Sequence, residues 1–261
     1  MTTPQHFDTD VAIIGYGPTG LTAALALGHH GVRAVAFERD ADIYPRARAV
    51  TVSDWTMRCF QSLGLDEVLA RGMDPTLALR WITYEGHEIT RMTFPPSRLG
   101  RHPQSYAIYQ PEMEKTLREA AKAHRDIVDV RYGVDVTGIE QDAESVTVRT
   151  RDLATGKEGS VRARYALACD GGSSTTRESL GIRLEGETRS TQWIVIDARV
   201  KRWWPQRNVL TFWSDKTRPV VDIALAQGNH RWEFPLEEHE SEADYMGLIY
   251  AARACFDPTE A

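Results

Sequence analysis

A glycine-rich turn between an apolar segment and an Ala/Leu-rich segment constrains the fold of this chain more than any other feature. Residues 10–14 are largely apolar and lead into the sequence Gly-Tyr-Gly-Pro-Thr-Gly at 15–20. Residues 18–30 then have the composition of a helix, and residues 33–38 that of a second buried strand. Strand, turn, helix and strand within about 30 residues predict one βαβ unit, whose parallel strands require a right-handed crossover.

The spacing of these glycines is the one that binds the pyrophosphate of a dinucleotide. Gly15 permits the tight turn, Gly17 lets the backbone approach a pyrophosphate, and Gly20 lets helix and strand pack closely. Free amides at the helix start, together with the helix dipole, favour anionic phosphates. Pro18 and Thr19 therefore join the predicted cofactor-binding residues.

An acidic residue at the end of the second strand supports the same interpretation. Glu38 lies 18 residues after Gly20, where its carboxylate can accept hydrogen bonds from ribose hydroxyls, and Arg39 follows it. The alternative is a parallel α/β turn whose glycines serve packing only. That alternative does not account for the acid, so we predict a dinucleotide site.

A distant segment indicates which dinucleotide is bound. Residues 165–177 run from an apolar strand into Asp170-Gly171, with Ser174 and Arg177 at fixed offsets. This D-G-x-x-S-x-x-R pattern resembles a motif of the class A flavoprotein monooxygenases, the FAD-dependent aromatic hydroxylases. The resemblance implies that Asp170, Gly171 and Arg177 shape the FAD pyrophosphate region and the approach of NAD(P)H. The alternative is a surface Asp-Gly turn before a Ser-capped helix.

Two more segments are similar to the same family. Residues 48–65 resemble the R-A-x segment after the second strand, which implies that Arg48, rather than Arg46, lies on the flavin side. Residues 109–118 are similar to the Q-P-x-L-E-x-x-L-R helix start, which implies a ribityl or phosphate contact for Gln110. A surface cation and a polar residue near a helix start are the separate alternatives. Four family segments in the right order favour the resemblance.

The resemblance implies an α/β fold with a Rossmann-like FAD-binding domain and a second β-sheet substrate domain. A composition shift near 181–187 suggests the boundary. We expect residues 1–182 to form the FAD-binding domain, with inserted hairpin strands at 77–94. Residues 183–261 are expected to form the substrate-domain sheet and a helix at 240–253, like the branch containing 3-(3-hydroxyphenyl)propionate hydroxylase.

A third family motif, a later Gly-Asp pair whose aspartate binds the ribityl chain, is not found. None of the 19 glycines is followed by aspartate. We therefore expect a C-terminally incomplete form of the fold, in which part of the wall around the flavin is absent and water reaches it. Apolar sheet faces left uncovered suggest a complementing chain or a homo-oligomer.

The activity implied by the resemblance is hydroxylation of a small phenolic aromatic compound with FAD as cofactor, NAD(P)H as co-substrate and O2. No residue stands out as a catalytic base. A second hypothesis is a catalytically silent chain that binds a nucleotide or a partner. A simple NAD(P)-dependent dehydrogenase is a third, and it does not explain Arg48, Gln110 and Asp170 together. Trp203, Trp204, Trp213 and Trp232 either line the substrate side or, as aromatic residues in a sheet commonly do, pack in the core.

Composition narrows the partners and the location. The net charge of −6 gives no reason to expect nucleic acid or an anionic membrane as partner. No apolar run approaches the roughly 20 residues that span a bilayer, and the polar start lacks a secretory signal pattern. Three isolated cysteines suit a reducing cytoplasm. The eight histidines show no metal-binding spacing, and the pair at 29–30 suits a helix end.

Overall fold

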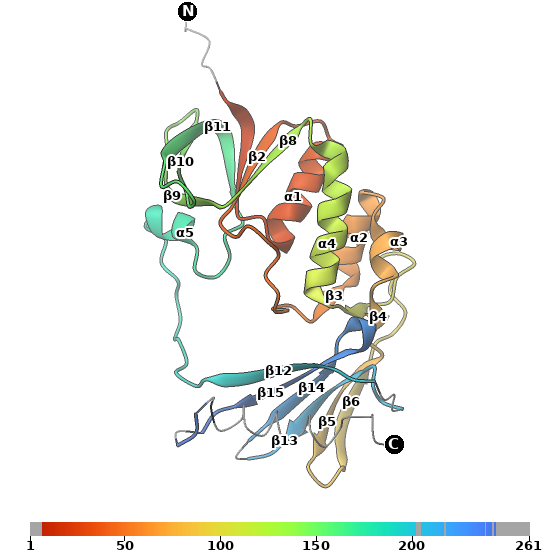
Figure 1. Cartoon of the computed structure of the whole chain (residues 1–261). Coiled ribbons are helices and arrows are strands. Elements are labelled where there is room, and N and C mark those ends of the chain that lie inside the picture. The colour runs from red at the N-terminus through yellow and green to blue at the C-terminus, as the bar shows by residue number, and fades with distance from the viewer. Residues whose placement is uncertain (1–6, 202–204, 217, 238, 242, 244–261) are drawn as a thin grey trace, which may run out of the picture. The chain divides into compact units, whose positions relative to one another are not determined.

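The structure is a computed structural model that divides the chain into two compact units (Figure 1). The described residues are 7–201, 205–216, 218–237, 239–241 and 243. The first unit combines Met1–Met73 with Ile108–Gly186, and the second combines Asp74–Ala107 with Glu187–Ala261. Most of the helix expected at 240–253, together with Trp203 and Trp204, lies outside the described residues.

The first unit is built on a six-stranded sheet in the order β8-β2-β1-β11-β10-β9. The strands β8, β2, β1 and β11 run parallel, as a βαβ unit requires, and β10 is antiparallel to both of its neighbours. The strands of this unit are β1 (Thr9–Ile14), β2 (Ala34–Glu38), β3 (Thr51–Ser53), β8 (Val128–Tyr132), β9 (Val134–Gln141), β10 (Val146–Asp152) and β11 (Glu158–Ala168). Its helices are α1 (Pro18–His29), α2 (Asp54–Ser62), α3 (Asp66–Ala70), α4 (Gln110–Ala121), the 3-10 turn η1 (Lys122–His124) and α5 (Thr175–Ser179).

Strand β11 joins the two halves of this sheet because it is long enough to serve both. Its first half pairs antiparallel with β10, from Glu158 to Ala163, and its second half pairs parallel with β1, from Ala163 to Ala168. Side chains alternate between the faces of a strand, so neighbouring residues of β1 enter different packing environments. Ala12 and Ile14 lie in a buried cluster with valines of β9 and β10.

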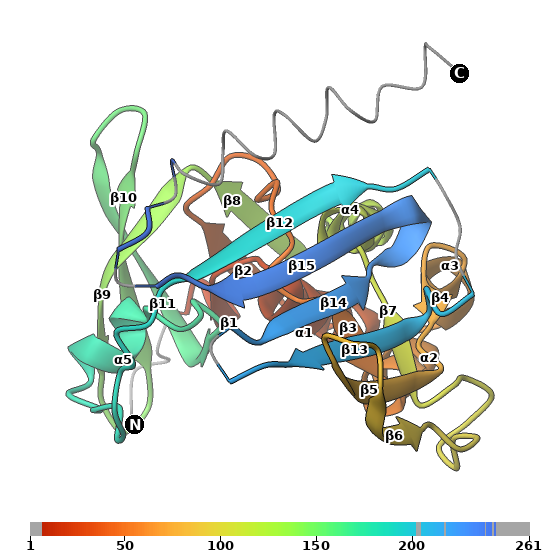
Figure 2. The same cartoon turned by 90° about the horizontal axis from the view of Figure 1, so that it is seen from below.

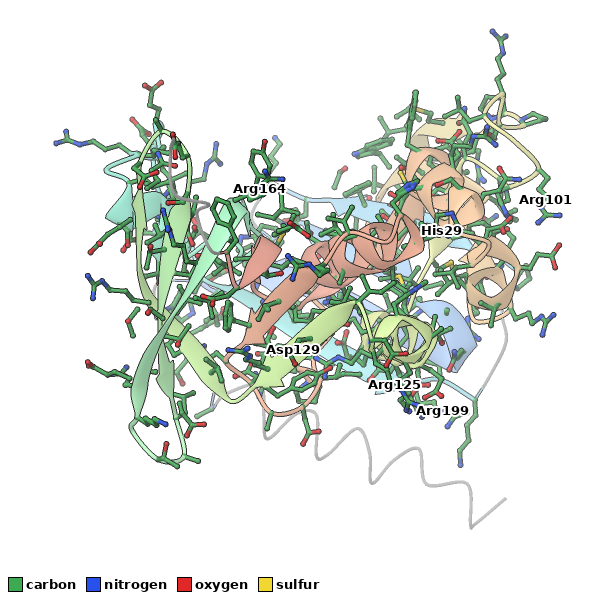
Figure 3. All side chains as sticks on the ribbon, turned by 90° about the horizontal axis from the view of Figure 1, so that it is seen from above. His29, Arg101, Arg125, Asp129, Arg164 and Arg199 are labelled. Atoms are coloured by element: carbon green, nitrogen blue, oxygen red, sulfur yellow. The ribbon has the colours of Figure 1, made fainter. Side chains whose placement is uncertain are left out.

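Helices α1 and α4 lie side by side in Figure 1. The approach of α1 to η1 is close, because a Cβ on Gly28 would lie 2.6 Å from the Cβ of His124. Helix α1 ends at His29, whose exposed side chain is labelled in Figure 3. Among the described residues, no helix is long and apolar enough to cross a membrane.

The second unit contains a six-stranded sheet in the order β12-β15-β14-β13-β5-β6, which Figure 2 shows face-on. Trp213 stacks on Tyr84 with ring centroids 6.0 Å apart, and the rings of Trp232 and His230 are 4.5 Å apart, so both tryptophans contact aromatic rings of their own unit. The elements of this unit are β4 (Asp74–Pro75), β5 (Ala78–Thr83), β6 (Glu88–Thr93), β7 (Ser105–Ala107), β12 (Trp193–Arg199), β13 (Val209–Ser214), β14 (Val220–Ala224), the 3-10 turn η2 (Ala226–Gly228) and β15 (Asn229–Pro235).

The hairpin strands predicted at 77–94 form, but their sheet partner differs from the expectation. They were expected as an insertion in the FAD-binding domain. In the structure β5 pairs parallel with β13, from Ala78 opposite Val209 onward, so the hairpin extends the second sheet. Alternating polarity predicts a strand but carries no information on its partner, which here lies more than a hundred residues away.

Two helices of the first unit border on other secondary structure at one end. Strand β3 directly precedes α2, which starts only after Ser53, whose hydroxyl accepts a hydrogen bond from the amide of Thr56 at 3.4 Å. A serine cap of this kind competes with helix at its own position. Helix α4 ends as an α-helix at Ala121 and continues as the 3-10 turn η1.

Candidate functional site

The turn after β1 needs glycine at the first and third of its three glycine positions because of close packing. Gly15 has a φ of +88°, and a Cβ there would lie 2.6 Å from the carbonyl oxygen of Cys169. Its amide donates to the carbonyl of Phe37 at 2.9 Å, which ties the turn to β2. A Cβ on Gly20 would lie 1.9 Å from the carbonyl oxygen of Gly15, so α1 could not start this close to β1 with any side chain at this position.

Gly17, the second glycine of the turn, is not closely packed, because open space lies in front of it. It is the N-cap of α1, with φ −71° and ψ −170°, a conformation that any residue adopts. The nearest atom to a Cβ at Gly17 would be Nη2 of Arg48, at 4.0 Å. The glycine is therefore not required by packing within the chain. The space in front of the helix start is available to a ligand, which the helix dipole would favour if it is anionic.

Glu38 is held next to this helix start by two backbone amides. Its Oε2 accepts from the amide of Tyr16 at 2.7 Å, and its Oε1 accepts from the amide of Asp40 at 3.0 Å. Each carboxylate oxygen has two lone pairs, so both can accept a further hydrogen bond. The carboxylate is thus fixed and can still receive hydroxyl donors.

Gln110 ties the segment carrying Arg48 to the start of α4. Its Oε1 accepts from the amides of Arg48 and Ala49, at 2.9 and 2.6 Å, and its Nε2 donates to Oε1 of Glu114 at 2.7 Å. Gln110 and Glu114 are only 3% and 2% exposed. Burial raises the pKa of the Glu114 carboxyl, while the bond from Gln110 partly offsets this shift.

The Asp170 motif forms a compact loop held by its own polar groups. Asp170 accepts from the hydroxyl of Ser174 at 2.7 Å and from the amide of Thr176 at 3.0 Å. Burial alone would raise the pKa of Asp170, but the hydrogen bonds from Thr176 and Ser174 outweigh it and lower that pKa. Arg177 donates through Nη1 to the carbonyl of Gly172 at 2.9 Å and through Nη2 to Glu178 at 3.1 Å. The aspartate is therefore a stable anion.

These groups surround a cavity of about 670 Å³ within the first unit. Ten of the twelve residues predicted to bind a cofactor line it, namely Gly15, Gly17, Pro18, Thr19, Glu38, Arg39, Arg48, Gln110, Asp170 and Gly171. The other two, Gly20 and Arg177, are not among its lining residues. Gly20 instead allows the close approach of helix and strand, and Arg177 donates hydrogen bonds to Gly172 and Glu178 close to it in the chain. Arg46, the alternative to Arg48, does not line the cavity either.

Sequence reasoning missed part of the wall. Val134, Asp135 and Val136, at the start of β9, line the cavity, and no local motif marks them. Cys169 also lines it, directly before Asp170 in the chain. Burial, aided by the neighbouring carboxylate of Asp170, raises the pKa of the Cys169 thiol, so it stays protonated and is not an activated nucleophile.

A second group of potential ligand atoms lies in the other unit. Glu237, His239 and Glu240 each place one atom within 4.8 Å of the others, a geometry that could hold a metal ion. Nη2 of Arg218 already pairs with both glutamates, at 3.0 and 2.6 Å. A bound cation would have to compete with this guanidinium, so we assign no metal site there.

The cavity suits the ADP half of a dinucleotide. Its volume falls in the range of small-molecule sites, roughly 300–1,000 Å³. The open space at Gly17, the amides at the start of α1 and the guanidinium of Arg48 suit a pyrophosphate. The fixed carboxylate of Glu38 suits ribose hydroxyls. Fold and site together define a dinucleotide-binding α/β protein.

Comparison with known families specifies this class further. Residues 8–244 match the family described as "FAD binding domain". The chain belongs to this family. The cofactor expected from the motifs, FAD, is thereby confirmed at the level of the family.

Curated relatives confirm the resemblance to the hydroxylase branch named in the sequence analysis. A 3-(3-hydroxy-phenyl)propionate/3-hydroxycinnamic acid hydroxylase from Mycobacterium sp. (strain JLS) is 36% identical over 237 residues, covering 90% of this chain and 40% of the relative. The protein of the same name from Paraburkholderia xenovorans (strain LB400) is 35% identical, covering 92% of this chain and 38% of the relative. The chain thus spans about two fifths of the length of these relatives.

Solved structures confirm the α/β fold class. p-Nitrophenol 4-monooxygenase PnpA from Pseudomonas putida DLL-E4 superimposes with a TM-score of 0.82 at 24% identity, over 94% of this chain and 62% of that one. The flavin-dependent monooxygenase PieE, solved in complex with FAD and substrate, gives a TM-score of 0.80 at 25% identity, over 94% of this chain and 46% of that one.

Proposed function

We propose that this chain is the FAD-holding, N-terminal part of a monooxygenase that hydroxylates a phenolic aromatic compound with NAD(P)H and O2. The observation that carries the proposal is the cavity at the glycine-rich turn, in which the predicted residues from four separate segments meet. The names of the curated relatives, hydroxylases of hydroxyphenyl acids, support the substrate class.

The proposed cofactor-binding residues divide into those that would touch FAD and those that act through others. Gly15, Gly17, Pro18 and Thr19 would present backbone to the pyrophosphate, and Glu38 would accept from the ribose. Gly20, Gln110 and Arg177 act indirectly, by packing and by holding the neighbouring backbone. The remaining proposed residues lie around these groups at the wall, namely Arg39, Arg48, Asp170 and Gly171.

FAD, when bound, supplies the redox chemistry that links oxidation of NAD(P)H to the activation of O2. The chain's part is to bind and orient the cofactor. The buried face of the sheet next to the cavity, with Ile14 and Phe37 at its wall, limits the access of water on that side. We name no catalytic base.

The proposal is tested by titrating the purified chain with FAD and following flavin fluorescence and the visible spectrum. Saturable binding of FAD supports it, and a chain that cannot be reconstituted with FAD would overturn it. Substrate-stimulated oxidation of NAD(P)H, with a hydroxylated phenol as product, then tests the activity itself.

A second candidate function is a catalytically silent chain that binds nucleotide and associates with a partner, either a complementing chain or a second copy. Tyr165 and Leu167 favour it, because these residues of β11 are 69% and 38% exposed although the strand pairs parallel with β1. Parallel sheets usually have both faces covered. FAD binding without turnover, together with a mass above that of the monomer in light scattering, supports this candidate.

We also propose a reducing cytoplasm as the location. The proposal rests on the isolated cysteines, of which the described Cys59 and Cys169 are free thiols.

A further inference from the structure

The side-chain amide of Gln110 has one orientation that satisfies its surroundings. The amides of Arg48 and Ala49 both point at Oε1, so the flipped amide would place its NH2 group against two N–H donors. The other end of the amide faces the carboxyl of Glu114, which accepts from Nε2 at 2.7 Å. Backbone and carboxyl therefore select the same orientation from opposite sides.

Glu114 is an unusual residue for its position. It lies within α4, is 2% exposed, and follows Gln110 by one helical turn. Burying a carboxyl is unfavourable unless a hydrogen bond compensates for it, and the bond from Gln110 does so. Whether charged or protonated, the carboxyl keeps an oxygen that can accept this bond.

The segment that Gln110 holds is part of the cavity wall. Arg48 and Ala49 both line the cavity, and Nη2 of Arg48 lies 4.0 Å from the position of a Cβ on Gly17. A second bond, from the amide of Ile108 to the carbonyl of Val50 at 2.9 Å, keeps the two segments adjacent. A change in the backbone at Arg48 would move the guanidinium that faces the helix start.

We infer that Glu114 is a positioning residue of the cofactor site: it fixes the amide of Gln110, and through it the Arg48–Ala49 backbone, in the arrangement that binds FAD. The inference rests on the proposed function for its binding measurement. The backbone arrangement itself can be measured without cofactor, so that part of the inference is independent of the proposed function.

The experiment uses four variants of the full chain. Glu114→Leu removes the acceptor, and Glu114→Gln keeps one. Gln110→Glu places two carboxyls against each other. The exchange of both residues, Gln110→Glu with Glu114→Gln, restores every bond, because a carboxylate at 110 accepts from the two amides and from the new amide at 114.

Two measurements are made on each variant: hydrogen exchange of the Arg48 and Ala49 amides without cofactor, and FAD affinity by fluorescence titration. Loss of protection and about tenfold weaker FAD binding are expected for Glu114→Leu and, at mildly alkaline pH, for Gln110→Glu. Glu114→Gln and the exchanged pair should stay within about twofold of the original chain. Glu119→Leu, at an exposed site on the same helix, is the matched control and should change neither measurement.

A positioning role predicts that the exchanged pair recovers the amide protection and the FAD affinity lost in Gln110→Glu. A general packing role predicts instead that the effects of the two single substitutions add. Unchanged protection of Arg48 and Ala49 in Glu114→Leu, or an exchanged pair no better than Gln110→Glu alone, would overturn the inference. If Glu114→Leu does not fold, the inference is tested by comparing Gln110→Glu with the exchanged pair. If the original chain binds no FAD, the proposed function fails, and hydrogen exchange still decides the inference.

Discussion

Replacing Gly17 by valine should weaken cofactor binding strongly while leaving the fold intact. Apart from the chain neighbours of Gly17, the nearest described atom to a Cβ at this position is Nη2 of Arg48, at 4.0 Å, and the backbone φ of −71° suits any residue. The valine side chain would therefore extend into the cavity. It would occupy the space in which the pyrophosphate must approach the backbone at about 2.9 Å to accept its hydrogen bonds.

The size of the effect follows from the bonds that are lost. A hydrogen bond to a charged group contributes about 1.5–3 kcal/mol, and a side chain at the helix start would block one or two of them. A loss of about 3 kcal/mol corresponds to roughly a hundredfold weaker binding. The free energy of unfolding should fall by only about 0.5–1 kcal/mol, because valine is a poorer helix N-cap residue than glycine.

Gly20→Ala is the matched variant with the opposite expectation. Its Cβ would lie 1.9 Å from the carbonyl oxygen of Gly15, so helix and strand must separate. Forced overpacking of this kind costs typically about 1–3 kcal/mol of stability. Urea unfolding and FAD titration on both variants measure the two quantities. Unchanged FAD affinity in Gly17→Val would refute the proposed site, and equal destabilisation by both variants would refute the distinction between an open and a packed glycine.

Two further predictions concern stability. Asp170→Asn should destabilise the chain at neutral pH, and the difference from the original should shrink as the pH falls below the ordinary value of 3.8. The lowered pKa of Asp170 means that its carboxylate stabilises the fold above that value, and that this contribution is lost as the pH falls through the lowered pKa, which urea unfolding at several pH values checks. Gly28→Ala should lower the melting temperature, because its Cβ would lie 2.6 Å from that of His124, by roughly 2–4 °C for each kcal/mol lost. An unchanged melting temperature would show that η1 moves aside freely.

Local sequence was sufficient to predict the βαβ unit because each of its parts has a local cause. The turn requires glycine at 15 for its positive φ and at 20 for the close approach, and both requirements are visible as residue types. Glu38 belongs to the same unit, because it is the last residue of the second strand. It could therefore be predicted, without the rest of the chain, that these segments line the cavity.

The parts that sequence did not predict depend on long-range pairing. The wall contributed by Val134–Val136 exists because β9 and β10 curl over the face of β1 that carries Ile14. The pairing of β5 with β13 is likewise invisible in either segment alone. Gln110 shows a third kind of limit: its motif predicts a ligand contact, and no local pattern reveals that its oxygen also accepts from two backbone amides of the chain.

Two acids of the cavity wall, Glu38 and Asp170, are held by backbone amides before any ligand binds, which links binding to stability. Glu38 accepts from the amides of Tyr16 and Asp40, and Asp170 accepts from the amide of Thr176. Side chains that are already ordered lose little conformational freedom on binding, so the wall is preorganised for a polar ligand. The same bonds belong to the fold, because removing the carboxylate of Glu38 leaves the amide of Tyr16, a residue 1% exposed, without this acceptor. A Glu38 variant must therefore be measured for both FAD affinity and stability. Its weaker affinity identifies a ligand contact if the loss of binding free energy exceeds the loss in the free energy of unfolding measured on the same sample.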